Sequence, residues 1–129
     1  TTAEQLQQAY ALLSLGDPAA ALLRFEAALG DPAARADVAR GHLYHGARAA
    51  AQAGQRARAL EWLAEDVRRR RERIGALERA VASGGLDAEA REAALAERDR
   101  LLRHLDHARR AEPAFAGLRG APEFEAAFE

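Results

Sequence analysis

The sequence predicts an all-α fold built from antiparallel helix pairs, and three observations predict it. Of the 129 residues, 35 are Ala and 17 are Leu, whereas three are Val and one is Ile. Ala gives up no side-chain entropy in a helix, so this composition favours helices and excludes a β-sandwich or a parallel sheet. Apolar residues also recur at helical spacing along most of the chain. Finally, Gly-Asp-Pro-Ala-Ala occurs at 16–20 and again at 30–34, and these residues suit the end of one helix and the start of the next.

The length of the chain is that of a single domain, which comprises residues 1–129. Two short helices are predicted on either side of the first joint. Thr2 and Gln5 match a capping box that opens the first helix, and Gly16 ends it. The second helix lies between the two joints. Its apolar positions have the spacing of one buried face: Ala21, Leu22, Phe25, Ala28 and Leu29.

A second helix pair is predicted after the second joint. Its first helix runs from about Arg35 to Ala53 and ends at Gly54, and it buries Ala39, Leu43, Ala47 and Ala50. From Gln55 the apolar period continues without a breaker as far as Ser83-Gly84-Gly85. The fourth helix therefore approaches 27 residues, or roughly 40 Å at about 1.5 Å per residue.

A long helical hairpin is predicted from the segment that follows these glycines. Leu86 and Asp87 match a hydrophobic staple and an N-cap, and the helix that they open reaches about Arg110. Folding the chain back at Gly84 places Arg71 near Glu97. The tail from Glu112 to Phe128 contains two Pro and two Gly, so it is expected to form short helical turns that close one end.

The helix pairs resemble the tetratricopeptide repeat (TPR) family, whose pairs repeat roughly every 34 residues and stack on one another. In the first pair the matching residues are Leu12, Gly16-Asp17, Ala21, Phe25, Ala28 and Asp31-Pro32. In the second pair they are Leu43, Ala47, Gly54, Ala59, Leu63 and Asp66. Gln8-Ala9 and Gly46-Ala47 replace the usual Leu-Gly, and no Pro closes the second repeat, so residues 1–67 are interpreted as two degenerate repeats.

The C-terminal part is similar to the ends of bacterial TPR proteins, which often carry A-L-E-W-L and a terminal D-P-x-F-x-x-L-R-x-x-P-x-F. The corresponding segments here are 59–63 and 112–124. The hairpin at 68–110 is then an insertion, and 111–129 is a C-terminal capping segment. The resemblance implies a non-enzymatic scaffold or adaptor that binds a protein or peptide in a concave groove.

In such repeats the first helix of each pair lines the groove, so the resemblance implies groove residues on the face of these helices that does not enter the core. They are Leu6, Tyr10, Leu13, Tyr44, Arg48 and Gln52. Tyr and Arg are enriched in binding hot spots. The alternative is that Tyr10 and Tyr44 pack against a neighbouring helix or the tail. The chain contains neither Lys nor Asn, with which carboxylate-clamp members of the family hold a peptide C-terminus, so an acidic C-terminal motif is not the expected ligand.

All four histidines lie in two H-x-x-H pairs, His42/His45 and His104/His107. A three-residue spacing puts both members of a pair on one helix face, and two such faces are able to chelate zinc or nickel if they meet. A metal-binding helical protein is therefore an alternative function. Solvated or capping histidines are the favoured interpretation.

The run Arg68-Arg69-Arg70-Arg71 with Arg73 suggests nucleic acid as a partner and a regulator module as another alternative. The run goes right round a helix, acidic residues flank it, and the chain has a net charge of −1 with few aromatic residues for stacking. A solvated, salt-bridged helix is therefore favoured.

The hairpin offers self-association as a further possibility. We expect Ile74, Leu77, Val81, Leu86 and Leu95 to have few partners within the chain, and pairing with a second copy in a four-helix bundle would bury them.

The chain contains no Cys, and Ser14 and Ser83 are its only serines; neither belongs to a nucleophile elbow, and no Gly-rich phosphate loop is present. We therefore expect no catalytic residues and no required cofactor. The sequence shows no apolar run of about 18 residues and no charged-then-apolar leader, so we expect no membrane span and a cytoplasmic location.

Overall fold

The computed structural model describes all 129 residues, and it is all-helical, as the composition predicts. The elements are α1 (Thr2–Ser14), α2 (Pro18–Ala28), α3 (Pro32–Ala36), α4 (His42–Gln52), α5 (Arg56–Ala82), α6 (Ala88–Arg110), the 3-10 turn η1 (Pro113–Phe115) and α7 (Pro122–Ala127). None of these helices combines the length and the apolar character needed to cross a membrane.

Helices α2 and α3 begin at the two predicted joints. The Asp17 carboxylate accepts a hydrogen bond from the Ala20 amide, and the Asp31 carboxylate accepts one from the Ala33 amide. Proline occupies the first turn of each helix, where its missing N–H leaves no intrahelical bond unmade. Both joints are therefore confirmed as helix starts.

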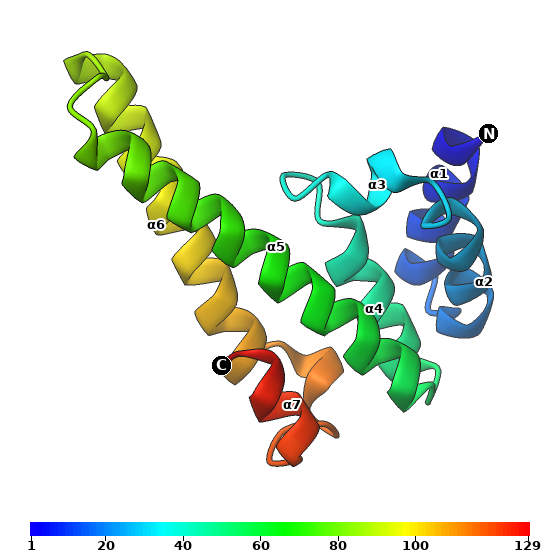
Figure 1. The fold of residues 1–129 in the computed structure, drawn as a ribbon. Helices are drawn as coiled ribbons and strands as arrows, with labels where there is room; N and C mark the ends of the chain where they lie inside the picture. Colours follow the sequence, from blue (N-terminus) through cyan, green and yellow to red (C-terminus); the bar gives the residue numbers. More distant parts are fainter.

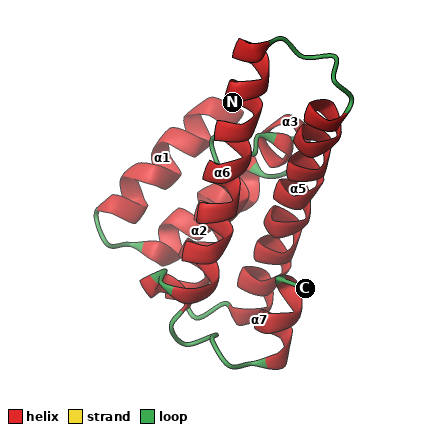
Figure 2. Ribbon diagram, turned by 90° about the vertical axis from the view of Figure 1, so that its left-hand side faces the viewer, coloured by secondary structure: helices red, strands yellow, loops and turns green.

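Consecutive helices pack against one another, with α1 on α2, α2 on α4, α4 on α5 and α5 on α6. Helix α4 is central because α2 and α5 cover two of its sides. Figure 1 shows α5 and α6 as a long hairpin that extends past the other helices, with α7 near its base. The view in Figure 2 shows α5 and α6 running side by side.

The predicted helix from Arg35 to Ala53 is wrong, because a turn at residues 37–41 divides it into α3 and α4. The Asp37 carboxylate accepts a hydrogen bond from the Arg40 amide at 3.0 Å, which holds this turn. Gly41 then adopts a φ of +67°, in the left-handed region that favours glycine, and α4 begins after it. Ala39, which was expected in the core, is exposed in the turn.

Two further local predictions are corrected by the structure. The capping box at the N-terminus consists of Thr1 and Glu4, whereas the Thr2 hydroxyl donates a hydrogen bond to Asp31. In the hairpin, Glu97 accepts hydrogen bonds from Arg73 at 2.6 and 2.9 Å, so its partner is Arg73 and not the predicted Arg71. The length of α5 is confirmed at 27 residues.

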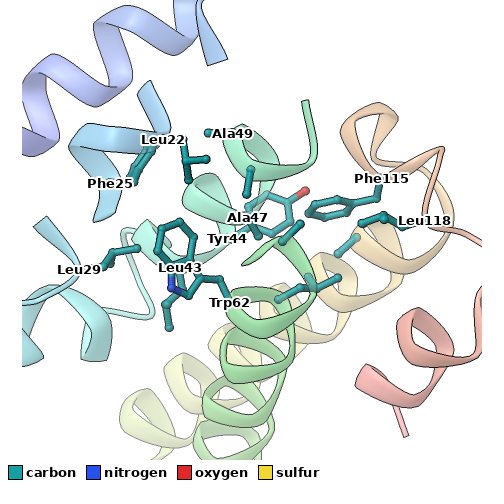
Figure 3. Packing of buried hydrophobic residues seen from close by; sticks show 14 of the residues in the cluster. Leu22, Phe25, Leu29, Leu43, Tyr44, Ala47, Ala49, Trp62, Phe115 and Leu118 are labelled. Atoms are coloured by element: carbon teal, nitrogen blue, oxygen red, sulfur yellow. The ribbon is translucent and has the colours of Figure 1, made fainter. Parts of the chain in front are cut away.

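The main core lies where α2, α4, α5 and the C-terminal segment meet (Figure 3). Its largest fully buried side chains are Trp62, Phe25, Phe115 and Phe124. A separate small cluster within the hairpin consists of Ile74, Leu77, Ala94 and Leu101. The C-terminal segment therefore completes the main core, whereas the distal hairpin depends on its own few contacts.

Candidate functional site

One side of α4 carries a row of polar side chains, which we call the α4 row: His42, His45, Arg48 and Gln52. Spacings of three and four residues place them along one side of a helix. His42 is buried, His45 and Arg48 are half-buried, and Gln52 is exposed. The row therefore runs from the interior to the solvent.

Tyr10 of α1 contacts the buried end of the α4 row. Its hydroxyl shares a hydrogen bond of 2.7 Å with Nδ1 of His42. Its ring meets Phe25 edge-on at 5.3 Å between centroids and His45 at 5.4 Å. Burial, reinforced by the negative charge of Asp37, raises the pKa of the Tyr10 hydroxyl to about 12. Tyr10 is thus a neutral and oriented side chain at neutral pH.

His45 is held in its neutral form by its surroundings. Its Nδ1 lies 3.0 Å from Nη1 of Arg48, and a guanidinium only donates hydrogen bonds, so Nδ1 accepts. Burial lowers the pKa of His45 to about 4, and the charges of Arg48 and His104 lower it in the same direction. Burial likewise lowers the pKa of His42.

Arg48 joins the α4 row to the C-terminal segment. Its Nε forms an ion pair with the carboxylate of Glu112, a buried residue that directly precedes η1. Tyr44 is buried beside this pair and meets Phe115 edge-on at 5.8 Å. Burial raises the pKa of the Tyr44 hydroxyl, and the neighbouring Glu112 carboxylate raises it further. One end of the face is therefore occupied by the chain's own segment.

The six predicted groove residues have different surroundings. Leu6, Tyr10 and Leu13 of α1 are half-buried and pack against the main core, and Gln52 is exposed. Tyr44 is 6% exposed, so it packs within the chain as the alternative interpretation held. The structure brings Tyr10 and Arg48 together around His45.

The four histidines do not form a metal-ligand set. His45 and His104 both lie against the Tyr44 ring, at 5.3 and 4.4 Å between centroids. His104 has its Nε2 3.7 Å from Asp66, and His107 has its Nε2 3.8 Å from Glu112. Nowhere does the structure gather three or more His, Cys or acidic side chains in an arrangement that holds a metal ion.

The arginine run is engaged mainly by acidic side chains. Arg68 pairs with Glu72, Arg69 with Glu65, Arg70 with Asp66 and Arg73 with Glu97. Arg71 donates to the terminal carbonyl of Glu129. The charges of this run are therefore largely matched within the chain.

The hairpin residues predicted for self-association are less free than expected. Ile74 and Leu77 are 8% and 7% exposed, because they pack on Ala94 and Leu101 in the small hairpin cluster. The expectation of few intramolecular partners is wrong for these two residues. Val81, Leu86 and Leu95 are half-buried. Self-association through this face stays a prediction.

Sequence reasoning did not predict the burial of three charged residues that it considered for other reasons: Asp66, Arg70 and Glu112. The i, i+4 spacing of Asp66 and Arg70 was a signal for their pair, which measures 2.8 Å. No local signal marks Glu112, because its partner Arg48 is distant in the chain.

No family model, curated protein or solved structure matches this chain.

Proposed function

We propose that the chain is a non-enzymatic, TPR-like interaction module that binds a segment of another protein along the α4 row, beside α1. The observation that carries this proposal is the contact that both Tyr10 and Arg48 make with His45, in the same row as the exposed Gln52. Tyr and Arg are, with Trp, the residue types enriched in the hot spots of protein interfaces.

The packing order of the helices supports a repeat interpretation. The pair α1/α2 is followed by α4/α5, and α2 packs on α4 between them. Stacked antiparallel pairs of this kind place their first helices, here α1 and α4, on the same side. The half-buried Leu6 and Leu13 of α1 would supply an apolar border beside the α4 row.

Preorganisation also favours binding at this face. The rotamer of Tyr10 is restrained by the His42 hydrogen bond, and that of Arg48 by Glu112 and His45. Side chains that are already ordered lose less conformational entropy when a partner binds. A partner segment would meet the half-exposed edges of these residues and the solvent-facing Gln52.

Site-specific photo-cross-linking in a lysate of the source cell tests the proposal. A photo-reactive residue replaces Gln52 in one variant and Leu23, which is 67% exposed on α2, in the matched control. We expect a defined protein to be linked at position 52 and not at position 23. Identical products at both positions, or none at position 52, would contradict the proposal.

A further inference from the structure

A cavity of about 680 Å³ lies between the turn that follows α3 and the α5/α6 hairpin. Val38 and Ala39 line it from the turn, and Leu101 lines it from α6. Its polar lining includes Arg70 from α5 and Arg100 from α6. Figure 1 shows this turn projecting from the end of α3, before α4 begins. The cavity is separate from the α4 row, none of whose residues lines it.

Arg70 presents hydrogen-bond donors that the protein does not use. The residue is only 6% exposed, and its Nε donates to Asp66 at 2.8 Å. Its Nη1 and Nη2 donate no hydrogen bond within the chain, and neither is sealed from solvent. A Cβ on Gly41 would lie 3.0 Å from Nη2, so the glycine leaves room for this guanidinium. The protein thus fixes one edge of the guanidinium and leaves the other available.

The charges around the cavity leave an excess of positive charge. The Glu97 carboxylate is occupied by two hydrogen bonds from Arg73, and Asp66 is occupied by Arg70. Asp37 bonds to the Arg40 amide and pairs with the Arg40 side chain.

Arg100 forms no ion pair of its own, although its charge, after the hydrogen bond and charge of Arg73, helps to lower the pKa of the Glu97 carboxyl. The cavity is therefore lined by one guanidinium that forms no ion pair, that of Arg100, and by Arg70, whose charge is matched by Asp66 but whose Nη groups donate no hydrogen bond.

We propose that this cavity binds a small organic anion, whose carboxylate or phosphate group lies between Arg70 and Arg100. Guanidinium groups recognise both kinds of anion through paired, charge-assisted hydrogen bonds. The apolar part of the ligand lies against Val38 and Leu101. The volume is within the range of about 300–1,000 Å³ that is typical of small-molecule sites. This inference does not depend on the proposed protein-binding function.

Calorimetric titration of the full chain tests the proposal with four probes. Hexanoate and phenyl phosphate represent the carboxylate and the phosphate, and hexanamide and benzyl alcohol are their uncharged counterparts. We expect saturable binding of at least one anion and none of its uncharged counterpart. The stronger of the two anions identifies the headgroup. Absence of saturable binding for both anions, or equal binding of the uncharged probes, would overturn the proposal.

Two variants and a matched control assign the binding to this cavity. Arg100→Ala removes one guanidinium and is expected to weaken anion binding about tenfold, the equivalent of one charge-assisted hydrogen bond. Ala39→Glu adds a carboxylate to the cavity lining and should abolish binding. Arg103→Ala, at another exposed arginine of α6 outside the cavity, should leave binding unchanged. Equal losses in Arg100→Ala and Arg103→Ala would show diffuse surface attraction and overturn the site.

Discussion

The indole of Trp62 lies directly against the backbone of Gly46, where α4 and α5 cross. A Cβ built on Gly46 would be 2.9 Å from Cε3 of Trp62 and 3.2 Å from Cδ1 of Leu29. Both of these side chains are fully buried, so neither has room to move away. Gly46 therefore sets how closely α4 approaches α2 and α5, and with it the position of the α4 row.

Gly46→Ala is expected to destabilise the protein, although Ala is the better helix former by about 1 kcal/mol. The added methyl group overpacks the core, which typically costs about 1–3 kcal/mol. Gly75→Ala is the matched control within α5, because its Cβ would meet only the Arg79 guanidinium, the mobile end of a side chain. The control should gain up to about 1 kcal/mol. Urea denaturation measures both changes, and equal stabilisation by both substitutions would contradict the close contact.

Arg48→Gln is expected to lower the free energy of unfolding by about 3 kcal/mol, because it leaves the buried Glu112 carboxylate without its counter-ion. Arg109→Gln breaks the comparable Arg109–Glu125 pair, whose side chains are 44% and 37% exposed. Such a surface pair contributes about 0–1 kcal/mol. Thermal unfolding measures the loss of stability in each variant. Similar losses in Arg48→Gln and Arg109→Gln would show that the Arg48–Glu112 pair does not hold the C-terminal segment in place.

The stability of the protein should fall as the pH is lowered from about 6.5 toward 4. His45 has its pKa lowered from 6.5 to about 4 in the folded chain, so between these values the unfolded chain binds more protons. The neutral His45 side chain contributes up to about 3 kcal/mol to the free energy of unfolding. This contribution is fully present above pH 6.5 and is lost as the pH falls toward 4. The lowered pKa of His42 acts in the same direction.

His45→Gln isolates this contribution and is measured by urea denaturation from pH 8 to pH 5. The variant should have a smaller pH dependence than the wild type across this range. The lower limit of pH 5 keeps the titration of Glu65 out of the measurement. The hydrogen bond from Arg35 is the main cause that lowers the pKa of Glu65 to about 2 in the folded chain. The stability that Glu65 contributes is therefore lost only below about pH 4.5. An unchanged pH dependence in His45→Gln would contradict a buried neutral imidazole.

The sequence predicted those elements that local chemistry determines. The Asp-Pro joints and the uninterrupted apolar period specify the starts of α2 and α3 and the length of α5. The break at 37–41 was missed because the apolar period continues through it. Two features of the structure account for the break. One is the turn held by the Asp37 carboxylate, and the other is the space beside Gly41 that the Arg70 guanidinium occupies. The second feature is a tertiary contact.

The residues of the candidate site were predicted only in part from the sequence. The resemblance to stacked helix pairs predicted Tyr10 of α1 and Arg48 of α4 as groove residues, and both side chains contact His45 in the structure. The sequence did not specify Glu112 as the buried partner of Arg48, and it left open whether Tyr44 lines the groove or packs on the tail, where Phe115 covers it. Such pairings join residues far apart in the chain, and neither composition nor periodicity specifies them.

The distal hairpin should open independently of the main core, because its buried cluster has only four residues and is separate from the core around Trp62. Leu77→Ala removes packing within that cluster, a change that costs about 2–5 kcal/mol at a buried leucine. We expect faster amide hydrogen exchange in residues 74–95 of this variant, whereas the amides of α4 keep their wild-type protection. Leu43→Ala, in the main core, is the matched comparison and should accelerate exchange throughout. If Leu77→Ala accelerated exchange in α4 as much as in the hairpin, the two clusters would unfold as one cooperative unit.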